Sequence, residues 1–112
     1  MPRPRKARLV QGRPIVNAFV PDIMPPWGQE ETYLPLEGLE AIRLSDLNGL
    51  DQETASRMMN VSRQTFGRVL AEARAVVADA LVNGKVLRIQ GGHYEMPPWG
   101  RARHRRGWRG GF

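Results

Sequence analysis

The sequence predicts a mainly α domain, in which a helix-turn-helix of three helices, the last one long, is flanked by short strands. Two observations lead to this prediction. All nine prolines lie at positions 2–35 or 97–98, and because proline breaks helix interiors, the helices should fall inside the proline-free window 36–96. Within that window, apolar residues recur at intervals of three and four, which is the period of an amphipathic helix.

Charge divides the 112 residues into three parts. Residues 1–13 contain five basic residues and no acid, and so do residues 101–112. Residues 14–100 hold seven bases and eleven acids, a net charge of −4 within a chain of net charge +6. We therefore divide the chain into a basic N-terminal arm (1–13), a helix-turn-helix domain with flanking strands (14–95) and a basic tail rich in arginine and glycine (96–112).

The type of base is informative, because nearly all are arginine and lysine occurs only at positions 6 and 85. Arginine binds phosphate through a planar fork and also stacks on bases. The composition thus favours a nucleic-acid partner. In the alternative interpretation, the terminal runs are solvated tails without a function.

Several classes of protein are excluded by what the chain lacks. It has no cysteine, so disulfides, thiolate metal sites and cysteine nucleophiles are excluded. It has no apolar run of membrane-spanning length and no recognisable export signal. We expect a soluble cytoplasmic protein that has no contact with a membrane.

The first elements are predicted as follows. Residues 14–20 (PIVNAFV) predict a short strand, since Val16, Ala18 and Val20 alternate with Asn17. A helix should begin at Leu36 and end at Asn48-Gly49, a pair that tolerates the left-handed conformation. Its apolar face is predicted to hold Leu36, Leu39, Ile42 and Leu47. Charged residues should point away from that face: Glu37, Glu40, Arg43 and Asp46.

The second and third helices are predicted from their caps. Asp51 should cap a short helix that runs to about Met59, and Ser62 should cap the next, which Asn83-Gly84 terminates. The apolar stripe of the third helix comprises Phe66, Val69, Leu70, Ala73, Val76, Val77, Ala80 and Leu81. The following stretch, KVLRIQGGHYE, predicts two short strands joined by a hairpin turn at Gly91-Gly92.

The spacing in residues 51–70 is typical of a helix-turn-helix. Small Ser56 stands where two helices would cross, and Asn60 occupies a turn position that requires positive φ. Apolar residues are placed to fill the space between the helices: Ala55, Met59, Val61, Phe66 and Val69. In such a motif the second helix enters the DNA major groove by its N-terminal residues. The alternative is a helical hairpin that serves only packing.

Four residues are predicted to contact base edges. Arg63 and Arg68 can bond guanine, and Gln64 can bond adenine. Gly67 leaves the helix surface flat for close approach to the groove, which would explain a glycine that costs about 1 kcal/mol relative to alanine.

Phosphate contacts are predicted at the helix start and in the arms. Ser62 and Thr65 lie at the helix N-terminus, where the helix dipole favours an anion. The arms add Arg3, Arg5, Lys6, Arg8, Arg103, Arg105 and Arg106. These charges should supply affinity without reading sequence.

The strings MPRPRKARLV, LEAIRLSDLNGLDQETASRMMNVSRQTFGRVLAEAR and VADALVNGKVLRIQGGHYE resemble a family of small prokaryotic proteins catalogued as domain of unknown function one-three-four. The resemblance covers roughly residues 1–10 and 36–95. It implies a helix-turn-helix similar to region four of sigma factors, with the recognition helix at residues 62–70. This chain lacks the terminal cysteines of many relatives, and Pro35 replaces a helix-capping residue.

The remaining chemistry is sparse. His93 and His104 are far apart in the chain, with no cysteine or paired carboxylate near either, so we expect no metal site. No nucleophile and base occur together, and no glycine-rich phosphate loop follows a strand. We expect neither an enzyme nor a bound cofactor.

Two features concern partners. The segment MPPWG occurs at 24–28 and again at 96–100, either as a docking motif or, the interpretation we prefer, as a tryptophan anchor for each connector. The lower half of the third helix (Val76, Val77, Ala80, Leu81) has more apolar surface than a short helix pair needs, so we expect a homodimer through it or through terminal strands.

The sequence thus predicts a transcriptional regulator that binds double-stranded DNA. Two rivals remain. One is a module of the sigma-region-four type that binds RNA polymerase or another regulator. The other is an RNA-binding protein that uses its arginine-rich ends.

Overall fold

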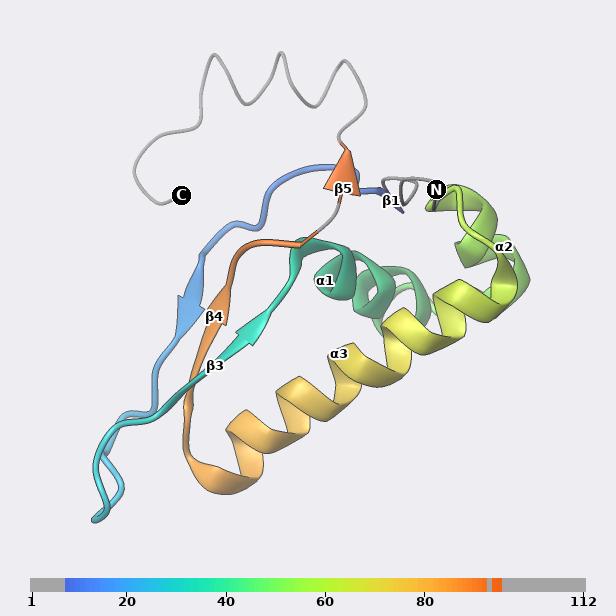
Figure 1. Ribbon diagram of the computed structural model, residues 1–112. Helices are drawn as coiled ribbons and strands as arrows, with labels where there is room; N and C mark the ends of the chain where they lie inside the picture. The colour runs from blue at the N-terminus through green and yellow to red at the C-terminus, as the bar shows by residue number, and fades with distance from the viewer. Residues whose placement is uncertain (1–7, 93, 96–112) are drawn as a thin grey trace, which may run out of the picture.

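A computed structural model describes residues 8–92, 94 and 95 of the chain (Figure 1). The fold is mainly α, with a long last helix and short strands, as predicted. In chain order the elements are β1 (Arg8–Leu9), β2 (Ala18–Phe19), β3 (Glu31–Leu34), α1 (Leu36–Ile42), η1 (Arg43–Leu47), α2 (Gln52–Met58), α3 (Arg63–Asn83), β4 (Val86–Ile89) and β5 (Tyr94–Glu95).

The first helix begins at Leu36, as predicted, although Pro35 supplies no capping side chain. The Pro35 carbonyl instead accepts from the amide of Leu39 at 3.1 Å. After Ile42 the helix widens into the π-helical turn η1, in which the Asn48 amide bonds the Arg43 carbonyl at 2.9 Å. The wider turn changes which side chains face inward.

Two predictions about this helix are wrong. Leu44 is fully buried while Leu47 is 78% exposed, so the core position falls three residues earlier than the regular helical pattern indicated. Glu37 and Glu40, expected to face outward, are both buried. The Glu40 carboxylate is paired with the Arg43 guanidinium, with Nη2–Oε2 at 2.6 Å, so the buried charge is compensated within the helix.

The long helix α3 joins two parts of the core. Its first half packs against α1, η1 and α2, in a cluster of Ala41, Leu44, Ala55, Met59, Phe66, Val69 and Leu70. Its middle packs against the strands, in a cluster of Leu34, Leu36, Ala73 and Ile89 with Val76, Val77 and Leu87 beside it. The apolar surface at Val76 and Val77 is therefore largely used within the chain. Leu81, predicted in the same stripe, is instead 78% exposed.

The strands form two small sheets. In the three-stranded sheet the order is β2-β4-β3, with β4 parallel to β3 and antiparallel to β2. In the other sheet β1 and β5 pair in parallel. The hairpin predicted at Gly91-Gly92 is therefore wrong, because β4 and β5 belong to different sheets. The strand predicted over 14–20 is also shorter, since β2 contains only Ala18 and Phe19.

Gly92 has two structural reasons to be glycine. Its φ of 103° is unfavourable for any residue with a side chain. In addition, a Cβ at this position would overlap the carboxylate of Glu37 and crowd Pro35. The chain therefore passes closely over the start of α1 as it leaves β4. Within the described residues, no helix is long and apolar enough to cross a membrane.

Candidate nucleic-acid interface

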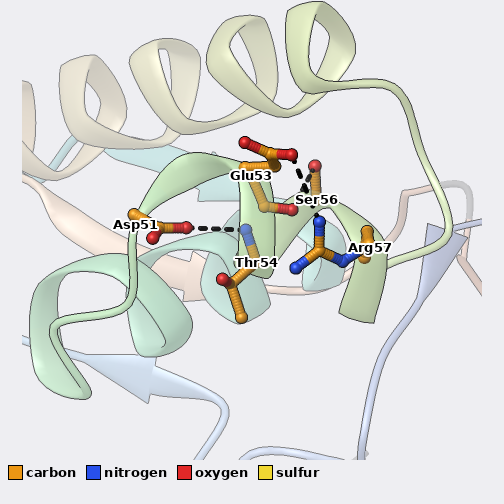
Figure 2. A network of polar contacts seen from close by, with 5 residues as sticks. All are labelled: Asp51, Glu53, Thr54, Ser56 and Arg57. Atoms are coloured by element: carbon orange, nitrogen blue, oxygen red, sulfur yellow. Dashed lines mark hydrogen bonds and ion pairs between the residues drawn. The ribbon is translucent and has the colours of Figure 1, made fainter.

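Helix α2 is stabilised by hydrogen bonds within residues 51–57, among them the Asp51 cap that the sequence predicts (Figure 2). Asp51 caps α2, with its Oδ1 accepting from the Thr54 amide at 2.7 Å. Buried Ser56 donates its hydroxyl to the Glu53 carbonyl at 2.8 Å, which satisfies a polar group at the helix crossing. Glu53 also accepts from Arg57 at 3.4 Å on the exposed face of α2.

The turn between the helices follows the predicted geometry. Asn60 has a φ of 58° and is the only described non-glycine residue with positive φ. The Val61 amide donates to the Ser56 carbonyl at 3.0 Å, so the chain reverses direction close to the end of α2. Asparagine tolerates this conformation better than most residues because its short polar side chain bonds locally.

Ser62 caps α3 as predicted, with its Oγ accepting from the Thr65 amide at 3.1 Å. The Ser62 hydroxyl also donates to Thr65 Oγ1 at 3.0 Å. Both side chains that we expected at a phosphate therefore bond one another in this structure. The Thr65 hydroxyl keeps its own proton for an outside acceptor, since it acts as acceptor in that bond.

The residues predicted to read bases share the outer side of α3. Arg63, Gln64 and Arg68 are exposed, while Phe66 between them is fully buried against α1 and α2. Because the buried face is fixed by the core, the orientation of the exposed face is fixed as well. We call Ser62, Arg63, Gln64, Thr65 and Arg68 the outer face of α3.

Gly67 faces the neighbouring helix. A Cβ at this position would lie 3.3 Å from Oε1 of Gln52, the first residue of α2. Because this atom is the end of a flexible side chain, the packing against Gln52 does not by itself require glycine at this position. Sequence reasoning did not single out Gln52, although its exposed amide lies beside the outer face. The sequence feature that could have indicated Gln52 is its position directly after Asp51, the residue that caps α2.

Acidic groups limit how much of α3 could bind an anionic ligand. The pKa of Asp51 is lowered, chiefly by the hydrogen bond from the Thr54 amide and also by the positive charges of Arg57 and Arg63. Asp51 therefore stays charged and offsets part of the Arg63 charge. Glu72 is exposed one turn beyond Arg68. An anionic ligand would fit only the first two turns of α3, because Glu72 would repel it further along.

Arg8 differs from its prediction as a phosphate contact. It is 3% exposed in β1, and the neighbouring Leu9 amide donates to the Met59 carbonyl at 3.0 Å. Arg8 lines a cavity of about 300 Å³ whose other lining residues include Arg68, Glu37 and Glu72. A side chain so deeply buried cannot reach a DNA phosphate, so we no longer expect Arg8 to be a phosphate contact. Strand β1 (Arg8–Leu9) lies within the stretch 1–13, which the sequence predicts to be an arm.

The other predicted arm contacts lie outside the described residues: Arg3, Arg5, Lys6, Arg103, Arg105 and Arg106. The same holds for His93 and His104, the two histidines considered for a metal, and for the second MPPWG segment. Among the residues that are described, no group of three or more His, Cys, Asp or Glu is placed to hold a metal ion.

Comparison with known proteins identifies the family. Residues 1–97 match the family described as a protein of unknown function, DUF134. A "UPF0251 protein" of Caldanaerobacter subterraneus subsp. tengcongensis is 50% identical over 113 residues, which cover 96% of each chain. Another, from Thermoanaerobacter pseudethanolicus, is 52% identical over 86% of this chain and 81% of its own length.

A third relative, from Desulfosudis oleivorans, is 52% identical over 84% of this chain and 68% of its own length. No solved structure matches the chain. None of these similarities bears on the likeness to sigma-factor region four, which stays a prediction. The match over most of the chain shows that this protein belongs to the DUF134 family of uncharacterised proteins.

Proposed function

We propose that this protein is a regulator that binds double-stranded DNA by inserting the start of α3 into the major groove. One observation supports this most strongly. Arg63, Gln64 and Arg68 stand exposed on the same helix that buries Phe66 completely, directly after a helix-turn-helix turn. Side chains that can form hydrogen bonds to base edges are thus held on a rigid helix, as the reading of a DNA sequence requires.

Each residue has a defined part in this proposal. Arg63 and Arg68 bond guanine edges and Gln64 bonds adenine. Thr65 and the helix N-terminus at Ser62 meet a phosphate, where the dipole of a 21-residue helix favours negative charge. In this proposal the exposed side-chain amide of Gln52 bonds the DNA strand that carries this phosphate. Gly67 keeps the helix surface low between the two arginines.

The basic ends supply affinity in this proposal. Arg3, Arg5 and Lys6 precede β1 in the sequence, and the Leu9 amide of β1 bonds the Met59 carbonyl at the end of α2. Each phosphate that is neutralised should steepen the logarithmic salt dependence of binding by about 0.9. Arg103, Arg105 and Arg106 have the same role at the other end.

This role requires no catalytic step, no metal and no cofactor. It also requires a compartment that contains duplex DNA, so we propose that the protein is soluble and cytoplasmic.

The test is selection from a random pool of duplex DNA at near-physiological salt. The full chain should enrich a motif, and the variant R63A/Q64A/R68A should not. The control R88A removes a positive charge from β4, where Arg88 pairs with Glu31, and should enrich the same motif as the native protein. Circular dichroism of each variant verifies that α3 is intact.

Other results would identify a different function. If native protein and triple variant bind DNA equally well without enrichment, the helix does not read sequence and the proposal fails. RNA binding that depends only on the arginine-rich ends would indicate an RNA-binding protein. Binding to RNA polymerase that survives the triple substitution would indicate a protein-interaction module.

A further inference from the structure

An apolar groove lies at the end of α3 that is remote from the helix-turn-helix. Its volume is about 410 Å³. The groove is lined by Phe19 and Val20, by Leu87 of β4, and by Ala80 and Leu81 of α3. Lys85 also lines it, and its ammonium is paired with the Asp79 carboxylate at 2.9 Å. Leu81, Val20 and Phe19 are each more than half exposed, so apolar surface is left in contact with solvent.

The connector between β2 and β3 places more apolar side chains beside the groove. It extends past the end of the three-stranded sheet, at the lower left of Figure 1. Ile23, Met24 and Trp27 are exposed along it, and we call these three residues the apolar tip. Pro25, in the first MPPWG segment, packs near Gly84, where a Cβ would lie 3.0 Å from its Cγ. The tip is thus anchored next to the groove, but its tryptophan is 67% exposed.

The composition of this surface is that of an interface. From residue 14 to residue 28 the chain carries a single charge, Asp22, although a quarter of the whole sequence is charged. Interface cores are depleted in charge and enriched in aromatic residues and methionine. The tip and the groove carry such side chains in an exposed state, among them Trp27, Met24 and Phe19.

The backbone of β2 adds a second feature. The strand order β2-β4-β3 places β2 at an edge of its sheet. In the part of the chain that the structure describes, no strand pairs with its outer side. An edge strand with exposed apolar neighbours favours pairing with another chain.

We propose that a second copy of this chain covers this surface, in a twofold dimer in which the apolar tip of each copy enters the groove of the other. A projecting apolar tip beside a concave apolar groove is self-complementary, as a twofold interface requires, because each contact occurs twice.

This dimer would also determine the DNA site, a consequence that rests on the proposed function. At 1.5 Å per residue, the distance along α3 from Ser62 to Leu81 is about 28 Å. Two such helices joined near Leu81 hold their N-termini at opposite ends of the dimer. Inclined to one another, they can place those ends about 34 Å apart, the separation of two major-groove half-sites on one face of DNA.

The test is the molar mass of the full chain by sedimentation equilibrium. We expect the native protein to have twice its chain mass of 12.6 kDa, and the variant L81E to have the mass of one chain. L47E is the matched control, because Leu47 is as exposed as Leu81, at 78%, and lies at the end of η1 away from the groove. It should remain a dimer. Neither substitution touches the buried core, so both variants should fold.

A second measurement uses the absence of cysteine from the chain. Oxidation of the variant I23C/L81C should join two chains, giving a band of twice the chain mass without reductant, whereas I23C/L47C should not. A native protein of single-chain mass would overturn the proposal. So would a dimer unaffected by L81E, or a double-cysteine variant that links only within one chain.

Failure here is distinguishable from failure of DNA binding. A monomer that enriches a single, non-palindromic half-site would disprove the dimer and leave the reading helix in place. A dimer that enriches no motif would support this interface and disprove the proposed function.

Discussion

Arg74 on α3 and Asp46 on η1 form a two-pronged ion pair between residues that are 28 apart in the chain, with Nη2–Oδ1 at 2.6 Å and Nε–Oδ2 at 3.2 Å. The pair fastens the end of the first helical segment to the middle of α3. It therefore helps to hold the outer face of α3 in a fixed orientation relative to the rest of the domain. Planar, two-pronged arginine–carboxylate pairs have the geometry best suited to that role.

The Asp46 pair predicts an acid-dependent loss of stability. The hydrogen bond from Arg74 lowers the pKa of Asp46 below its ordinary value. A lowered pKa in the folded state adds stability above the ordinary value near 3.8, and this stability is lost as the pH falls through the folded value. The effect should be modest, because both side chains are partly exposed. Urea unfolding between about pH 2 and pH 6 should show a flatter profile for D46N than for the native protein.

The variant R74Q and the double variant D46N/R74Q complete a cycle for this pair. The two substitutions should not be additive at neutral pH, because either alone removes the interaction. Additive effects would mean that the ion pair contributes nothing to stability.

Two glycines in helices should respond to alanine with opposite signs. Gly38 of α1 faces α3 so closely that a Cβ would lie 3.1 Å from the Cβ of Ala73 and 3.0 Å from Leu34 Cδ1. G38A should destabilise the fold by about 1 kcal/mol net, because overpacking exceeds the gain in helix propensity. G67A meets only the end of the flexible Gln52 side chain, so it should stabilise the fold by up to about 1 kcal/mol.

Chemical denaturation of both glycine variants measures these changes. DNA binding by G67A then tests the groove contact, since the added methyl group should weaken binding while the fold becomes more stable. Unchanged affinity would show that DNA binding does not require glycine at position 67. A stabilised G38A would contradict the close α1–α3 contact.

The cap of α3 should contribute measurably to stability. S62A removes the acceptor of the Thr65 amide and should cost about 1 kcal/mol, whereas S62D retains a capping oxygen and should cost much less. Thermal unfolding followed by circular dichroism compares the two. Equal losses in both variants would indicate that the cap oxygen is not what stabilises this end.

The central aromatic residue should dominate the energetics of the helix pair. Phe66 is fully buried in the cluster with Leu44 and Met59. F66A should cost about 3–5 kcal/mol, a large share of the stability of a small domain. F66L, which keeps most of the apolar volume, should cost clearly less. A loss below about 1 kcal/mol in urea unfolding of F66A would contradict the described core.

The acidic cap of α2 provides a separate pH dependence. The pKa of Asp51 is lowered mainly by the Thr54 amide, so its stabilising effect should be full above the ordinary value and disappear as the pH falls through the lowered value. D51N retains a good capping side chain that does not titrate. Its unfolding midpoint should therefore vary less with pH in the acid range than that of the native protein. An unchanged profile would assign the acid dependence to other carboxylates.

The helix-turn-helix was predictable from sequence because its determinants are local. The caps at Asp51 and Ser62 and the positive φ at Asn60 each depend on residues within a few positions. Local hydrogen bonds and the helical period leave few alternatives for such a segment. The exposure of Arg63, Gln64 and Arg68 followed directly from that period.

The sheets were decided by tertiary structure. Strand β4 pairs with β3 across the whole helical block and also with β2, and β5 pairs with β1 from the other end of the chain. The choice of a distant pairing partner does not show in the hydrophobic periodicity of either strand. The local signal of Gly91-Gly92 favoured a hairpin, but the longer-range pairings of β4 and β5 prevailed.

Tertiary structure also decided which charged residues are buried. Glu40 can be buried because Arg43 compensates it, and the π-helical turn exchanges Leu47 for Leu44 in the core. Arg8 changed from an expected surface contact to an interior residue once β1 docked at the end of α2. The sequence by itself determined the helix that we propose reads DNA, because that helix depends on neighbours in the chain. The surroundings of that helix depend on contacts between distant segments, which only the folded chain brings together.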